Sequence, residues 1–220
     1  MKTMEESYLK ALDEYFCARY SDYVKISAID GYVMPEVIYV AADGNIARRG
    51  PAVMRLDHQK NYAELLQKFK DGLVDTEFTF SFTAIPFMER VRNLFRDYTF
   101  AKFLPVVLER CGETVESAGE KLDIDPRIWK KMAKGKLYPQ KNTVLALALA
   151  CRMQSDDVND LLDVCEFTLD EDNVRDLVVR YLLERGIFNE EMRDRCLAEY
   201  KIRSLPIKKV KSEQENHEDL

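Results

Sequence analysis

The stretch of sequence that decides the fold is Asp125-Pro-Arg-Ile-Trp-Lys-Lys-Met132. Asp125 before Pro126 predicts a helix N-cap followed by a proline at the first helical position. In a helix that begins there, Trp129 and Met132 share one face, and this spacing predicts that both pack into a core. The lysines between them then fall on the outward side. The segment therefore predicts an amphipathic helix with a basic solvent face.

Charge is distributed unevenly around this helix. From Pro126 to Ser155 there are seven basic residues and no acid, whereas Asp156 to Asp172 holds eight acids and no base. The chain of 220 residues has a formal net charge of −6. A polyanion responds to charge within about a Debye length, roughly 8–10 Å, so local clustering matters more than the total. The acidic total argues against indiscriminate coating of nucleic acid, and the basic cluster favours contact at one face.

Helical periodicity continues from Phe100 onward, and short connections separate the segments. The pattern predicts helices over 100–111, 114–122, 126–134, 141–152, 156–164, 171–185 and 189–199. Gly186 is expected to end the penultimate helix, and Ser155 to cap the helix that starts at Asp156.

The first 99 residues mix helix and strand signals. Helical spacing predicts helices over 5–20, 60–71 and 86–97, and alternation predicts strands over 23–29, 36–42, 46–49, 53–56 and 77–82. Asp30-Gly31 and Asp43-Gly44 predict turns that join the first strands into an antiparallel meander. The chain is therefore predicted to be α+β, with a small N-terminal antiparallel sheet and helices followed by an all-α part.

Residues 101–164 resemble the helix-turn-helix domain of the Cro and lambda-repressor (XRE-like) family. The match runs without a gap through Leu104…Leu108…Gly112, Thr114 to Leu122, Ile124 to Met132, Gly135-Lys136, Pro139 and Asn142 to Ala150. In that family the third helix enters the major groove of DNA. The resemblance places this role on Arg127, Ile128, Lys130, Lys131 and Lys134, with Lys136, Tyr138 and Lys141 touching phosphates.

Residues 100–206 as a whole are similar to a C-terminal helical module of bacterial proteins, some of which carry macrodomains. The similarity continues through Phe167-Thr-Leu169, Asp176-Leu177, Arg180-Tyr181 and Gly186-Ile187-Phe188. The expected domains are an α+β sensor, dimerisation or partner domain over 1–97, an all-α repressor-like helix-turn-helix module with a two-helix extension over 98–206, and a disordered tail over 207–220.

The function expected from these features is DNA binding in bacterial transcription regulation, in the cytoplasm and on double-stranded DNA. Two departures from the family keep a second hypothesis open. Val115 stands where family members often carry glutamine, and Asp123, followed by Asp125, stands at the turn glycine, so two carboxylates would face phosphates. The alternatives are a protein-interaction adaptor that has lost DNA contact and an enzyme with an N-terminal site. A homodimer and a protein partner both remain open.

Nothing in the residue pattern indicates a cofactor, a metal or a membrane partner. The five cysteines are scattered and never spaced as CxxC, which is typical of reduced thiols, and the two histidines, His58 and His217, lie far apart. No run approaches the roughly 18 apolar residues needed to span a bilayer. No catalytic residue is assigned, because Asp57-His58 is a pair of ordinary loop residues on this interpretation.

Overall fold

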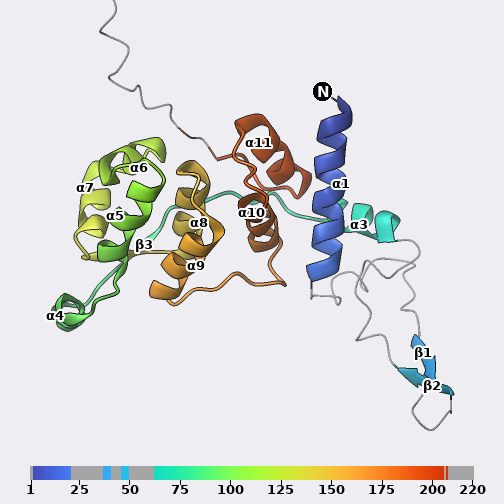
Figure 1. Ribbon diagram of the computed structural model, residues 1–220, viewed down its shortest axis with the longest axis horizontal. Coiled ribbons are helices and arrows are strands. Elements are labelled where there is room, and N and C mark those ends of the chain that lie inside the picture. The colour runs from blue at the N-terminus through green and yellow to red at the C-terminus, as the bar shows by residue number, and fades with distance from the viewer. Residues whose placement is uncertain (1, 21–36, 41–45, 50–61, 206, 208–220) are drawn as a thin grey trace, which may run out of the picture. The chain divides into compact units, whose positions relative to one another are not determined.

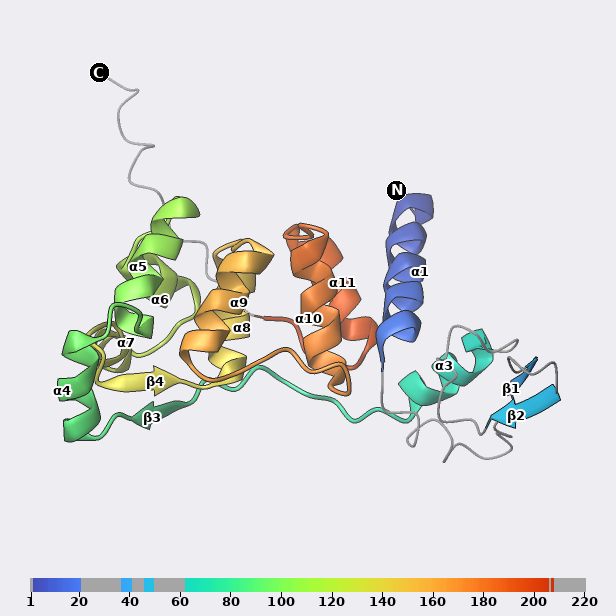
Figure 2. The ribbon, with the colours of Figure 1, turned by 60° about the horizontal axis from the view of Figure 1, so that its bottom comes forward.

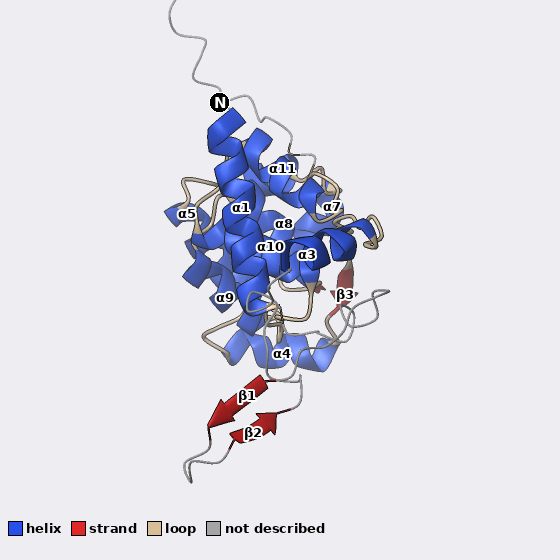
Figure 3. Cartoon of the chain, turned by 90° about the vertical axis from the view of Figure 1, so that its right-hand side faces the viewer, coloured by secondary structure: helices blue, strands red, loops and turns tan. Residues whose placement is uncertain are grey.

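The computed structural model describes residues 2–20, 37–40, 46–49, 62–205 and 207. The predicted strands over 23–29 and 53–56, the Asp57-His58 pair and the tail from 208 lie outside the described residues. Within the described part, the predicted α+β class is confirmed: helices dominate, and the strands form small antiparallel sheets (Figures 1 and 3). No helix in this part is both long and apolar enough to cross a membrane.

The chain forms two compact units. Unit 1 combines Met1–Thr76 with Leu169–Arg203, and unit 2 combines Glu77–Thr168 with Ser204–Leu220. This division differs from the predicted boundary between residues 97 and 98. The two-helix extension, expected to belong with the helix-turn-helix, packs on the N-terminal helix instead, because its apolar faces meet the aromatic side chains of that helix.

Unit 1 is built on four described helices and a hairpin. The helices are α1 (Lys2–Arg19), α3 (Tyr62–Asp71), α10 (Val174–Glu184) and α11 (Glu190–Glu199). Strands β1 (Val37–Val40) and β2 (Ile46–Arg49) pair antiparallel. α1 packs against α3, α10 and α11 (Figure 2).

The core of unit 1 is aromatic. The ring of Phe16 lies 4.8 Å from that of Tyr20, 5.9 Å from that of Phe69 and 4.7 Å from that of Tyr200, between centroids. Phe16, Tyr20 and Tyr200 are at most 1% exposed. Large aromatic side chains contribute most of the burial energy available to a small core, which explains how few helices hold this unit together.

Unit 2 contains the predicted helix-turn-helix segment. Its elements are β3 (Phe82–Ala84), α4 (Phe87–Phe95), α5 (Phe100–Arg110), α6 (Val115–Lys121), α7 (Pro126–Ala133), β4 (Leu137–Pro139), α8 (Lys141–Ala150) and α9 (Ser155–Val164). Every residue of α8 from Thr143 to Ala150 is buried. A helix that is apolar all round is a core helix, and α8 is the centre of this unit.

Two local predictions for unit 2 are wrong. The chain is not entirely helical after Phe100, because β4 forms between α7 and α8 and pairs antiparallel with β3. Ser155 is the first residue of α9 rather than its cap, and Gln154 occupies the N-cap position without a side-chain hydrogen bond.

The strand predicted over 77–82 is wrong except at Phe82, because residues 77–81 form no strand and β3 runs from Phe82 to Ala84. Phe78, Phe80 and Phe82 are nevertheless half-buried and alternate with exposed residues, as the pattern indicated.

Candidate nucleic-acid interface

Local side-chain caps set the start of both helices of the α6–α7 pair. Thr114 and Ser117 form a reciprocal capping box, with each side chain accepting from the other's backbone N–H at 3.0 and 2.9 Å. The Asp125 carboxylate accepts from the N–H groups of Arg127 at 2.7 Å and Ile128 at 3.3 Å, and Pro126 follows at the first helical position. The N-cap predicted at Asp125 is confirmed.

The turn between the two helices passes through a left-handed residue. Asp123 has a φ of 53°. Few residues other than glycine adopt this conformation readily, and aspartate and asparagine are the usual exceptions. Asp123 can therefore occupy the position where the resembled family has glycine, without changing the course of the chain.

Trp129 belongs to the core, as predicted. The residue is 6% exposed and its indole N–H donates to the Val115 carbonyl at 2.5 Å. Met132, one turn further on, is fully buried. These contacts fix the rotation of α7 about its axis, so its opposite side must face solvent.

The solvent side of α7 and the turn after it carry the predicted basic contacts. Arg127, Lys130, Lys131, Lys134 and Lys136 are all exposed. None of these five side chains makes an ion pair or hydrogen bond with another residue in the described part of the chain. We call these five residues the basic face. Within the described residues, no carboxylate forms an ion pair with these five charges.

Two other cations of unit 2 are paired. Lys121 pairs with Glu113, and Arg110 pairs with Asp157 at 2.5 Å. Ile128, the apolar residue predicted to read a base edge, is 38% exposed on the same helix as the basic face.

The remaining predicted contacts, Tyr138 and Lys141, are less accessible. Both are half-buried. The Tyr138 hydroxyl accepts a hydrogen bond from the Asn93 side chain at 2.9 Å, and Tyr138 lies in β4 opposite Thr83. Lys141 is the first residue of α8. The structure thus leaves six of the eight predicted residues well exposed and holds these two closer to the body of unit 2.

A groove of about 360 Å³ lies between α6 and α7 beside the basic face. Trp129, Gly119 and Ile124 contribute to its apolar wall, while Glu116, Glu120, Lys130 and Lys134 stand around it. Glu116, Glu120, Asp123 and Asp125 are all exposed. The surface therefore combines five cations with four carboxylates contributed by α6 and the turn.

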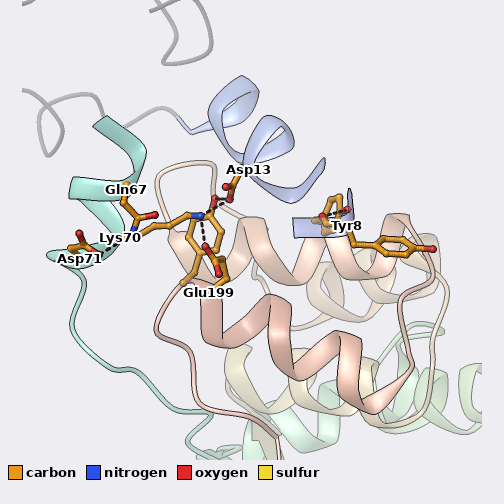
Figure 4. Close-up of polar contacts among 8 residues, drawn as sticks. Tyr8, Asp13, Gln67, Lys70, Asp71 and Glu199 are labelled. Carbon is orange, nitrogen blue, oxygen red and sulfur yellow. Dashed lines mark hydrogen bonds and ion pairs between the residues drawn. The ribbon is translucent and has the colours of Figure 1, made fainter. Parts of the chain in front are cut away.

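Unit 1 contains a buried polar cluster that the sequence did not predict. Lys70, which is 3% exposed, has its Nζ 2.6 Å from Asp13 and 2.7 Å from Glu199, and the Tyr200 hydroxyl donates to Asp13 at 3.0 Å (Figure 4). These residues come from α1, α3 and the end of α11, more than fifty positions apart, so no local pattern could reveal them. The mutual pairing suits a structural role, since it joins three helices.

The described residues offer no group of histidine, cysteine, aspartate and glutamate that could hold a metal ion. The cysteines are free thiols, and burial raises the pKa of Cys151 to about 12. A thiol with so high a pKa is a poor nucleophile at neutral pH.

Comparison of the chain with family models, with curated proteins and with solved structures finds no significant match. The resemblance of residues 101–164 to the repressor family therefore stays a prediction.

Proposed function

We propose that unit 2 binds double-stranded DNA through the basic face, as a helix-turn-helix regulator of transcription. The observation that carries the proposal is the absence, within the described chain, of any partner for the five exposed cations on and after α7. Surface lysines and arginines that form no ion pair keep their charge available, and such charge attracts phosphates.

Counterion release would supply much of the affinity. Each phosphate neutralised by a cation contributes about −0.9 to the slope of log affinity against log salt. Four to five contacts per protomer, from the five cations of the basic face, correspond to a slope of roughly −4 per protomer. Arg127 and Ile128 lie in the first turn of α7. Contact of base edges by these two residues would follow the recognition-helix geometry of this class of proteins.

The test is a titration of the full chain against a labelled duplex that carries the promoter of the protein's own gene. Fluorescence anisotropy at 50, 100 and 200 mM salt gives the slope. A slope near −4 per protomer supports the proposal, and a poly-anionic competitor such as heparin should displace the duplex. Affinity that does not change over this range would rule out phosphate contact by the basic face.

A protein-interaction adaptor is the second candidate, and the carboxylates favour it. Glu116 and Glu120 border the same apolar groove that Trp129 and Ile124 line, and their charges would repel phosphates. An apolar groove flanked by both signs of charge suits a short peptide. Failure to bind DNA at 50 mM salt, together with protection of the groove by a captured protein, would favour this candidate.

A further inference from the structure

Helix α4 exposes its apolar side. None of its residues is buried in the described structure, and Phe87 is 68%, Met88 67%, Leu94 71% and Phe95 83% exposed. Within unit 2, α4 follows β3 and lies to one side of the packed helices α5 to α9 (Figure 1). Scattered apolar residues on a surface are ordinary, but a contiguous face of this kind marks an interaction site.

These residues form one stripe. At 100° per residue, Phe87, Met88, Val91, Leu94 and Phe95 all fall within a face about 120° wide, and Tyr98, 75% exposed, extends the stripe beyond the helix end. A fully covered aromatic side chain buries about 150–250 Å². The stripe therefore presents on the order of 600 Å² of apolar surface, close to the roughly 800 Å² that each partner of a standard interface contributes.

The order of residues in the stripe is symmetrical about Val91. Phe87 and Phe95 lie four residues before and after it, and Met88 and Leu94 lie three residues before and after it. In two antiparallel copies of α4 crossing at Val91, each phenylalanine therefore meets a phenylalanine, and each methionine meets a leucine. A two-fold interface must be self-complementary, and this pattern meets that condition.

A hollow in unit 2 adjoins the stripe. A cleft of about 460 Å³ lies between α4 and the elements that follow it, with Phe87, Val91 and Leu94 on one wall and Ala101 and Ala133 on the other. Phe95, the most exposed residue of the stripe, projects as a knob. In a two-fold pair of chains, the knob of each copy can pack into the apolar hollow of the other copy.

We propose that α4 is the contact of a two-fold homodimer, with two α4 helices packed antiparallel around Val91. Arg90 and Arg92 flank the stripe, as they would on a membrane-surface helix, but Glu89 and Asp97 accompany them and weaken any attraction to an anionic bilayer. The dimer goes beyond DNA binding and joins two copies of the basic face in one particle. Its test needs no DNA, so either proposal can fail without the other.

The first experiment measures the mass of the full chain by sedimentation velocity over a range of concentrations. Wild type should sediment as a dimer. Phe95→Glu should weaken the dimer at least about a hundredfold, because the two-fold symmetry places the new charge at two positions of the apolar interface. The control is Val74→Glu, which changes an 80% exposed valine of unit 1 and should leave the dimer intact. Circular dichroism checks that both variants are folded.

The second experiment tests the geometry by cross-linking. Val91→Cys places a cysteine on the two-fold axis and should give a disulfide-linked dimer under mild oxidation. Glu89→Cys places it on the opposite side of α4 and should not, and wild type controls for the native thiols. A monomeric wild type, an unaffected Phe95→Glu dimer or equal cross-linking of both cysteine variants would overturn the proposal. So would a monomer that floats with anionic phosphatidylserine vesicles, which would assign the stripe to a membrane surface.

Discussion

The indole ring of Trp129 lies against the backbone of Gly119: a Cβ at residue 119 would come within 2.7 Å of three ring atoms. Real Cβ contacts are never so short, so the α6–α7 pair can pack this closely only with glycine at that position. The indole N–H of the same ring donates a hydrogen bond to the Val115 carbonyl at 2.5 Å. The ring cannot easily move away, and the orientation of the basic face therefore depends on a residue without a side chain.

Gly119→Ala should destabilise unit 2 by about 1–3 kcal/mol, the usual cost of overpacking a core. The matched control is Gly72→Ala, where the new Cβ would meet nothing closer than 3.5 Å. Its stability should stay near that of wild type or rise slightly, because Gly→Ala reduces the entropy of the unfolded chain. Urea denaturation measures both. Equal stability of the two variants would show that Trp129 repacks at little cost.

Reversal of Lys130 and Lys131 to glutamate should abolish DNA binding without unfolding the protein. Both side chains are exposed and make no described ion pair, and such surface changes cost under about 0.5 kcal/mol each. The control, Lys10→Glu with Lys68→Glu, changes net charge equally at exposed positions of α1 and α3. In an anisotropy titration at 50 mM salt, the DNA affinities of the two variants should differ by orders of magnitude. If both bind as wild type does, α7 is not the DNA-binding helix.

Asp125→Asn should strengthen DNA binding several-fold and leave stability nearly unchanged. Asparagine caps helices about as well as aspartate, so the bonds to the N–H groups of Arg127 and Ile128 persist. The substitution removes one negative charge beside the basic face. Asp125→Ala separates the two effects, because it removes the charge and also the cap, at a cost of about 1 kcal/mol. Weaker binding by a fully folded Asp125→Asn would contradict the electrostatic argument.

Burial of the Cys151 thiol should make the protein less stable at alkaline pH. Desolvation raises its pKa from 9.0 to about 12, so the folded state favours the neutral thiol. The contribution of the neutral thiol to the free energy of unfolding is complete below about pH 9. It is lost as the pH rises toward 12, at roughly 1.4 kcal/mol per pH unit. Urea midpoints at pH 8 and pH 10.5 should show a smaller loss in Cys151→Ala than in wild type, by about 2 kcal/mol. An equal loss of stability in wild type and in Cys151→Ala between these two pH values would mean that the thiol is hydrated in the folded state.

Lys70→Met should destabilise unit 1 by on the order of 2 kcal/mol. The change leaves Asp13 and Glu199 without their shared cation, and the penalty falls below the 3–5 kcal/mol of fully buried pairs because these carboxylates are 28% and 32% exposed. Lys68→Met is the control, since the Lys68–Glu64 pair at 2.9 Å is open to solvent and contributes little. Thermal melts followed by circular dichroism compare them. A neutral Lys70→Met would show that apolar packing replaces the cluster.

The sequence by itself determined those features whose causes are local. The N-cap at Asp125, the burial of Trp129 and Met132, and the helices from α5 to α9 all follow from the periodicity and capping signals of short segments. The same register places Lys130 and Lys131 outward, because a residue on the face opposite a buried pair has nowhere else to point. The class of fold was predictable for the same reason.

Only the tertiary structure decided what distant segments do to one another. The pairing of β3 with β4, the Lys70 cluster and the assignment of α10 and α11 to unit 1 each join residues more than fifty positions apart. The exposure of the α4 stripe likewise depends on how distant segments pack. An amphipathic pattern predicts that one face will be covered, but whether the chain itself or a partner covers it depends on long-range packing, which local periodicity does not encode.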